Sequence, residues 1–104
     1  MISKHFRLPA RQIKKVFRSG QRCQGQYLQT FILSRKTGAS RFAFIVSTKI
    51  EKKAVGRNKM KRICKSVILE NFPHKPIDVI ILTKKNFLEN GETAREELKK
   101  CLPK

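Results

Sequence analysis

The sequence predicts an α+β fold in which three helices pack on a sheet of three to four strands, in the order α-β-β-β-α-β-α. The chain has 104 residues, which suits one domain with a single modest core. Apolar residues make up 39% of it and fall into periodic blocks, so the chain is not a disordered basic tail. No internal repeat or linker divides residues 1–104, and we therefore treat them as one domain.

The first predicted helix covers residues 9–20, because proline suits the first turn of a helix and glycine its end. Ile13 and Phe17 belong to one apolar stripe on this helix, one turn apart. Residues 21–34 are rich in strand-forming side chains, and the run should be interrupted at Gly25 by a bulge or a break. One helix and one or two strands are therefore expected in the first third of the chain.

The remaining elements follow from three changes of period. Residues 41–48 alternate large and small apolar side chains, so the large ones should face the core and the small ones solvent or a ligand. A basic helix follows and should end near residue 72, where two prolines stop it. Residues 77–83 form a continuous apolar run typical of a buried central strand, and residues 91–102 form a final helix.

Residues 49–65 are the most informative stretch, with eight Lys or Arg and a single acid, Glu51. At about 100° per residue, the apolar side chains gather on one side of a helix: Met60, Ile63, Cys64, Val67 and Ile68. The other side gathers Asn58, Lys61, Arg62 and Lys65, with Arg57 and Lys59 on the flanks. Surface helices usually mix charges, since like charges repel. On this helix the polar side is almost purely cationic, and the whole chain has a formal charge of +18. An external polyanion is therefore expected to balance these charges, and a phosphate backbone is the commonest one.

No catalytic residue, metal site or protein-bound cofactor is expected. His5 and His74 fall in predicted loops without ligand spacing to a cysteine or to each other. The seven acids are scattered, and no phosphate-binding loop, zinc-protease motif or nucleophile elbow is present. The protein alone is therefore expected to be chemically inert, with no small-molecule substrate.

The cysteines and the hydropathy pattern suggest a cytoplasmic protein. Cys23, Cys64 and Cys101 are odd in number and far apart, so neither a disulfide nor a zinc framework is expected. Cys64, on the apolar side of the basic helix, should simply be core. No apolar run is long enough to span a membrane, and the first residues lack the apolar stretch of a secretory signal.

Residues 54–65 read AVGRNKMKRICK, which resembles a helix signature of the protein subunit of bacterial ribonuclease P, R-N-R-x-K-R-x-x-R. Four positions match outright: Arg57, Asn58, Lys61 and Arg62. Lys59 and Lys65 stand where the family usually has arginine, and lysine lacks arginine's planar bidentate contact with phosphate. Residues 47–49 resemble the family's strand end before this helix. Near the N-terminus, Leu8, Phe17 and Gly20 resemble the family's L-x-x-x-x-x-F-x-x-V-x-x-x-G pattern in compressed form. Ile13 stands at a position where the family commonly has an aromatic residue.

This resemblance implies a small basic partner of a catalytic RNA that removes the 5′ leader from precursor tRNA. The RNA subunit would perform the cleavage with bound divalent metal, expected to be Mg²⁺, and the protein would bind both this RNA and the precursor. The residues expected to contact RNA are Lys49, Lys52, Lys53, Arg57, Asn58, Lys59, Lys61, Arg62 and Lys65.

The resemblance also implies a cleft for the single-stranded leader between the first helix and the sheet. Phe17 and Phe31, with Ile13 beside them, are the candidates to line it, because aromatic rings stack on exposed bases. The alternative is that both rings are core, as most apolar aromatics are. The large residues of 41–48 can supply a core without them, which favours the cleft.

Two other functions fit the same charge and size. A small ribosomal or other non-enzymatic RNA-binding protein would share the basic helix but not the signature at residues 57–65. A DNA-binding protein could place the same helix in a major groove. However, Asn58 is its one side chain suited to reading bases, and the charges around it position a backbone rather than specify a sequence.

Overall fold

The structure, a computed structural model, describes residues 7–71 and 75–102. Its element order is the predicted one: α1 (Ala10–Ser19), β1 (Gln21–Gln24), β2 (Leu28–Ser34), β3 (Arg41–Ile45), α2 (Ala54–Glu70), β4 (Ile77–Thr83) and α3 (Gly91–Cys101). The residues expected to end the basic helix, Phe72 and Pro73, lie outside the described residues, as do His5 and His74.

The strands form one four-stranded sheet in the order β1-β2-β4-β3. β1 and β2 are an antiparallel pair that opens at Gly25, as predicted, and β2 runs antiparallel to β4. β3 lies parallel to β4, so the chain must cross over between them, and α2 is that crossover. β4 is interior and almost wholly buried, which confirms the prediction of a buried central strand.

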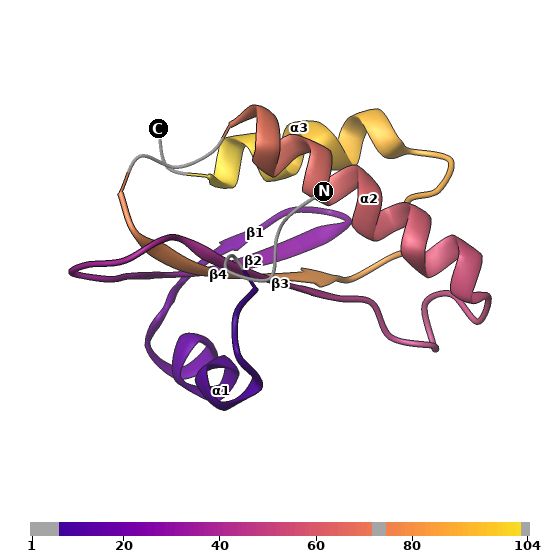
Figure 1. Cartoon of the computed structure of the whole chain (residues 1–104). Helices are drawn as coiled ribbons and strands as arrows, with labels where there is room; N and C mark the ends of the chain where they lie inside the picture. The colour runs from indigo at the N-terminus through magenta and orange to yellow at the C-terminus, as the bar shows by residue number, and fades with distance from the viewer. Residues whose placement is uncertain (1–6, 72–74, 103–104) are drawn as a thin grey trace.

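The two faces of the sheet are covered unequally (Figure 1): α2 and α3 lie on one face, and α1 lies alone on the other. The larger core cluster lies under α2 and α3 and includes Phe42, Met60, Ile68 and Leu98. The smaller cluster lies under α1 and consists of Leu8, Val16, Phe31 and Ile80, with partly buried neighbours. Near the β3 edge of the face that carries α1, Ala43 and Ile45 are only partly buried among the described residues.

The alternation in residues 41–48 correctly predicts which side chains face which layer. Phe42 is 1% exposed in the larger core, and Phe44 and Val46 pack against the same core. Ala43 and Ile45 face the α1 side and are only partly buried. The strand itself is shorter than the predicted run and ends at Ile45, because the chain turns at residues 48–50 to begin the crossover.

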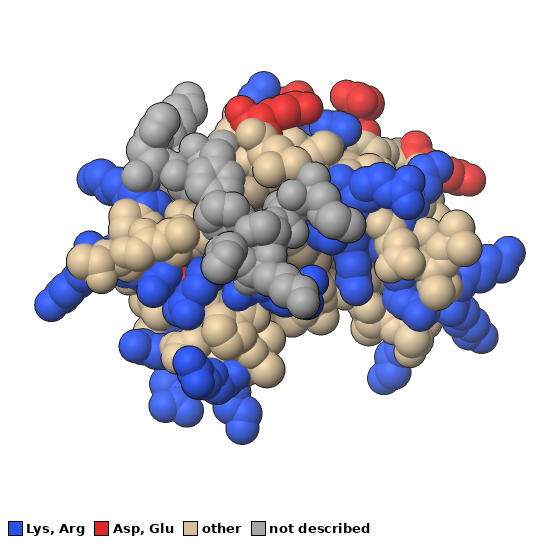
Figure 2. All heavy atoms as spheres, in the orientation of Figure 1, with Lys and Arg blue, Asp and Glu red and all other residues tan. Residues whose placement is uncertain are grey.

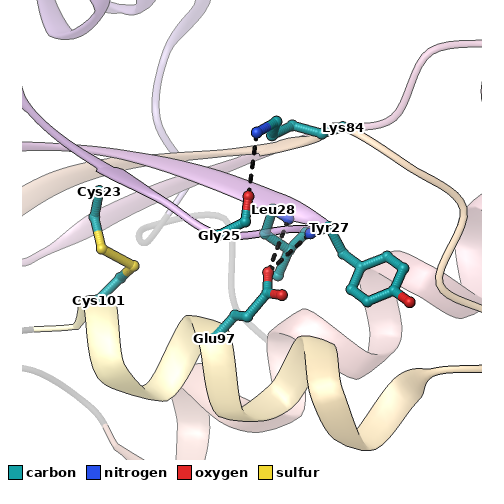
Figure 3. Close-up of a disulfide and its surroundings, with 7 residues drawn as sticks. All are labelled: Cys23, Gly25, Tyr27, Leu28, Lys84, Glu97 and Cys101. Atoms are coloured by element: carbon teal, nitrogen blue, oxygen red, sulfur yellow. Dashed lines mark hydrogen bonds between the residues drawn. A yellow bond between two sulfur atoms is a disulfide. The ribbon is translucent and has the colours of Figure 1, made fainter.

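The structure corrects the prediction for the cysteines, because Cys23 on β1 and Cys101 at the end of α3 form a disulfide (Figure 3). Their Cα atoms lie 5.8 Å apart although 78 positions separate them in the sequence. Spacing along the chain could not reveal this pair, since only the packing of α3 beside the β1 edge brings it together. The cytoplasmic setting stays a prediction, and it can no longer rest on unpaired cysteines.

A carboxylate beside the disulfide also ties α3 to the sheet, at the β1–β2 turn and the start of β2 (Figure 3). Glu97 Oε1 on α3 accepts hydrogen bonds from the backbone N–H groups of Tyr27 and Leu28, at 2.9 and 3.2 Å. The Glu97 carboxylate occupies the place that a Cβ atom would take at Gly25, so a larger residue there would displace this carboxylate. Lys84 Nζ donates to the carbonyl of Gly25 at 3.2 Å. The β1–β2 turn is therefore shaped to receive α3.

Candidate nucleic-acid interface

The start of α2 is held by the one acid of the basic stretch. Glu51 accepts a hydrogen bond from the backbone N–H of Lys53 at 3.0 Å and another from Asn86 Nδ2 at 3.0 Å. The bond from Lys53 is the main reason that the pKa of Glu51 lies below its usual value. Arg57 Nη1 donates to the carbonyls of Glu51 and Lys52, at 2.9 and 2.7 Å. These bonds fix the loop from which the cationic helix begins.

The two sides of α2 are those that its periodicity predicts. Met60, Cys64, Val67 and Ile68 are buried against the sheet and α3. The outward side bears a hollow of about 510 Å³ lined by Asn58, Lys61, Arg62, Lys65, Ser66 and Leu69. Leu69 is 49% exposed, so an apolar patch lies beside the cations. Backbone phosphates and the apolar parts of nucleotides could both be accommodated there.

A second hollow of about 330 Å³ lies between α2, the edge of β3 and the start of α1. Ala43, Phe44 and Ile45 of β3 form part of its lining together with Ile13 of α1, and the cations Arg7, Lys61 and Lys65 contribute as well. Lys65 Nζ lies 5.8 Å from the centre of the Phe44 ring, a cation–π distance. Lys61 and Lys65 line both hollows, so they form a cationic ridge between them.

Only one of the three predicted leader-cleft residues lines this hollow, and that residue is Ile13. Phe31 is 5% exposed and belongs to the core under α1, where it cannot offer a ring face to a base. Phe17 is 36% exposed and packs edge-on against Phe31, with ring centres 4.7 Å apart. Arg22 lies over Phe31 at 5.4 Å from the ring centre. Of the two aromatic rings, Phe17 is the one that a ligand can reach.

The other predicted RNA-binding residues surround the start of α2. Lys49, Lys52 and Lys53 are exposed in the loop before the helix, and Lys59 is exposed on the helix itself. Contact between these residues and RNA stays a prediction. Sequence patterns do not place Arg7 or Phe44 in the site, because their positions beside Lys61 and Lys65 depend on how the crossover packs against β3. Of the residues on β3, the sequence signal for this hollow is the small-residue face of residues 41–48.

Charge is distributed unevenly over the surface (Figure 2). On the face shown, Lys and Arg spread over α1 and the N-terminal half of α2, whereas Asp and Glu gather above α3. Within residues 7–71 and 75–102, no three His, Cys, Asp or Glu side chains come together in a way that could hold a metal ion. Among the same residues, no helix has the length and apolar character needed to cross a membrane.

Comparison with known proteins identifies the family. A sequence model of the family described as "Ribonuclease P" matches residues 3–104. The chain belongs to the ribonuclease P protein family. The ribonuclease P protein component of Microcystis aeruginosa is 36% identical over an alignment of 106 positions, which covers 94% of this chain and 88% of that protein. The component of Fusobacterium nucleatum is 35% identical over 83 residues, covering 78% and 74% of the two chains.

Solved structures of ribonuclease P proteins have the same fold. The Thermotoga maritima protein, solved in complex with 1-(4-fluorophenyl)-2-thiourea, superposes with a TM-score of 0.79 at 27% identity, covering 92% of this chain and 96% of that one. The Staphylococcus aureus protein superposes with a TM-score of 0.74 at 18% identity and supports the fold alone. The chain is thus a subunit of ribonuclease P, an endoribonuclease, and it associates with the RNA of that enzyme. This membership displaces the ribosomal and DNA-binding alternatives.

Proposed function

We propose that this subunit holds the single-stranded 5′ leader of precursor tRNA in the hollow between α1, β3 and α2 while the outward face of α2 binds the ribonuclease P RNA. The observation that carries the proposal is the lining of that hollow. Ile13, Ala43 and Ile45 give it an apolar part, and Lys61, Lys65 and Arg7 give it cations. An unpaired nucleotide has the matching chemistry, with an apolar base and an anionic phosphate.

The cationic ridge connects the two parts of this proposal. Because Lys61 and Lys65 line both hollows, RNA phosphates on the outward side of α2 and leader phosphates in the cleft would share the same two ammonium groups. Backbone contacts of this kind give affinity without sequence preference, which suits leaders of varied sequence. Binding of both RNAs would then bring the leader close to the ribonuclease P RNA.

The chemistry of cleavage is assigned to the RNA in this proposal. The protein offers RNA-binding side chains, and we expect it to have no hydrolytic activity alone and no cofactor of its own. Divalent metal, expected to be Mg²⁺, would be bound by the RNA-containing enzyme and would supply the activated nucleophile. The same proposal places the working enzyme in the cytoplasm, where precursor tRNA is processed.

The leader assignment is tested with reconstituted ribonuclease P carrying Ile13→Ala and Phe17→Ala together. Ile13 lines the hollow, and Phe17, one turn further along α1, lies outside it but offers an exposed ring on which a leader base leaving the hollow would stack. Stacking on an aromatic side chain contributes roughly 1–3 kcal/mol per base, so binding of leader-bearing precursor tRNA should weaken by about 5-fold or more. Mature tRNA, which has no leader, should bind as it does to the wild-type enzyme. Both affinities are measured at the same low magnesium and salt concentrations.

Leu88→Ala is the matched control. Leu88 is half-buried against the larger core cluster, under α2 and α3, and does not line the hollow between α1, β3 and α2. It should lower thermal stability without changing the ratio of the two affinities. If the double variant weakens both RNAs equally, the leader lies elsewhere. Cleavage of precursor tRNA by the purified protein without RNA would contradict the assignment of the chemistry to the RNA.

A further inference from the structure

A third cationic cavity, of about 380 Å³, lies at the other end of β3, where the β2–β3 turn meets α1. Its charged lining consists of Lys15 on α1, Arg35 and Lys36 on the turn, Arg41 on β3 and Asp78 on β4. None of these residues belongs to the hollows on either side of α2. The cavity is therefore a separate feature of the α1 face of the sheet.

The centre of this cavity is a buried ion pair. Asp78 is 3% exposed, and its carboxylate accepts two parallel hydrogen bonds from Arg41, from Nε at 2.9 Å and from Nη2 at 2.7 Å. The two residues are direct neighbours in the parallel β3–β4 ladder. A buried carboxylate is costly unless it is paired in this way. Asp78 therefore fixes the position and orientation of the Arg41 guanidinium.

Arg35 is also held in place. Its Nη1 donates to the carbonyl of Ala39 at 2.6 Å across the turn, and its Nε lies 3.7 Å from Asp78 Oδ1. Gly38, with φ of +96°, makes the tight turn that permits this arrangement. Two guanidinium groups thus converge on one carboxylate with little freedom to move.

The cavity carries more positive charge than the ion pair can neutralise. Four cationic side chains line it, and Asp78 is the one acid among its lining residues. Within the described part of the chain, Nη1 of Arg41 and the ammonium groups of Lys15 and Lys36 make no hydrogen bond or ion pair. Positioned guanidinium groups with unused donors, next to flexible lysines, are well suited to bind a phosphate group.

We propose that this cavity binds a backbone phosphate of RNA, as a third contact region beyond the two hollows beside α2. A purely structural role for the Arg41–Asp78 pair does not account for Lys15, Arg35 and Lys36 around the same space. Arg41 and Ala43 lie on the same side of β3, so the cavity continues the α1 face along which the cleft opens. The phosphate could come from the ribonuclease P RNA or from precursor tRNA, and the proposal does not require the leader to occupy the cleft.

The test uses a Lys15→Gln/Lys36→Gln variant, which leaves Arg35, Arg41 and Asp78 in place and so preserves the ion pair. The control is Lys99→Gln/Lys100→Gln, which removes the same charge from two exposed positions on α3, across the sheet. For both variants, affinity is measured against salt concentration in two arms: protein with ribonuclease P RNA, and reconstituted enzyme with leader-bearing or mature tRNA. Thermal melting confirms that each variant is folded.

Affinity decreases as salt rises, so the slope of log affinity against log salt is negative. Its magnitude should be smaller by roughly 0.7–0.9 for each phosphate that the Lys15/Lys36 variant no longer neutralises. A fall in the first arm assigns the phosphate to ribonuclease P RNA, and a fall in the second arm alone assigns it to precursor tRNA. If the slope matches that of the Lys99/Lys100 control in every arm, the cations act only through the general field and the site does not exist. Because the cleft test uses Ile13 and Phe17, either proposal can fail while the other stands.

Discussion

α2 and α3 cover the same face of the sheet, yet their outer surfaces differ in charge and in attachment. α2 carries five Lys or Arg and one acid, whereas α3 carries three of each. α3 is also tied to the sheet by a disulfide and by the hydrogen bonds of Glu97. The contrast indicates a division of work, in which α3 stabilises the fold and α2 keeps its charges for an external anion.

The largest expected effect concerns the attachment of α3. The Cys23→Ser/Cys101→Ser variant removes a bond that spans 78 positions, and loop-closure entropy for a span of that size corresponds to roughly 4 kcal/mol of unfolding free energy. Urea unfolding of the oxidised wild type and the variant measures this loss. Affinity of the folded variant for ribonuclease P RNA should not change, since neither cysteine lies near α2's outward face.

Reduced wild-type protein is the control for this variant, and it should unfold at the same urea concentration as the variant. If oxidised and reduced proteins prove equally stable, α3 is held by packing and by Glu97 rather than by the disulfide. If loss of the disulfide weakens RNA binding of the folded protein, the proposed division between the two helices is wrong.

A smaller effect, on binding rather than on stability, is expected on α2. In Lys61→Ala/Arg62→Ala, the affinity for ribonuclease P RNA should depend less steeply on salt. The magnitude of the slope of log affinity against log salt should be smaller by roughly 0.7–0.9 for each phosphate that is no longer neutralised. The melting temperature should stay close to that of the wild type, because Arg62 is exposed and Lys61 only partly buried. Lys99→Ala/Lys100→Ala on α3 should change neither quantity. Equal slopes for the two variants would remove the outward face of α2 from the interface.

The smallest effect is expected at Cys64, on the buried side of α2. Burial raises the pKa of its thiol to about 12, and Arg95 on α3 acts weakly in the opposite direction. The thiol should therefore stay neutral at pH 8 and react very slowly with iodoacetamide in the folded protein, but readily in urea. Rapid labelling of the folded Cys23→Ser/Cys101→Ser variant, in which Cys64 is the only thiol, would show that the inner face of α2 opens.

The same shift fixes the sign of a pH effect on stability. The unfolded chain ionises Cys64 as the pH rises above the ordinary value of 9.0, whereas the folded chain does not until about pH 12. The stabilising contribution is therefore complete below pH 9 and is lost as the pH rises above it. Replacement of Cys64 by Ala should remove this part of the alkaline destabilisation.

Most of the fold could be predicted because its signals are local. The short continuous apolar run of residues 77–83 predicts a buried strand, and β4 has the same bounds. The separation of Met60 and Cys64 from Lys61 and Arg62 on α2 follows from helical spacing alone. Phe31, predicted to line the leader cleft, is instead buried in the core under α1, because its strand carries no local signal of which side is covered. A strand with apolar side chains on both faces does not reveal which face α1 covers.

The order of elements, the cationic side of α2 and the need for an anionic partner follow from the residues in their order, because helical and strand periods and net charge require no knowledge of distant contacts. Three further features depend on tertiary packing: Cys23 meets Cys101, Asp78 orients Arg41, and Lys61 and Lys65 stand over the β3 edge. These contacts join segments that the strand order β1-β2-β4-β3 brings together. Their partners are far apart in the chain, so no local pattern specifies them.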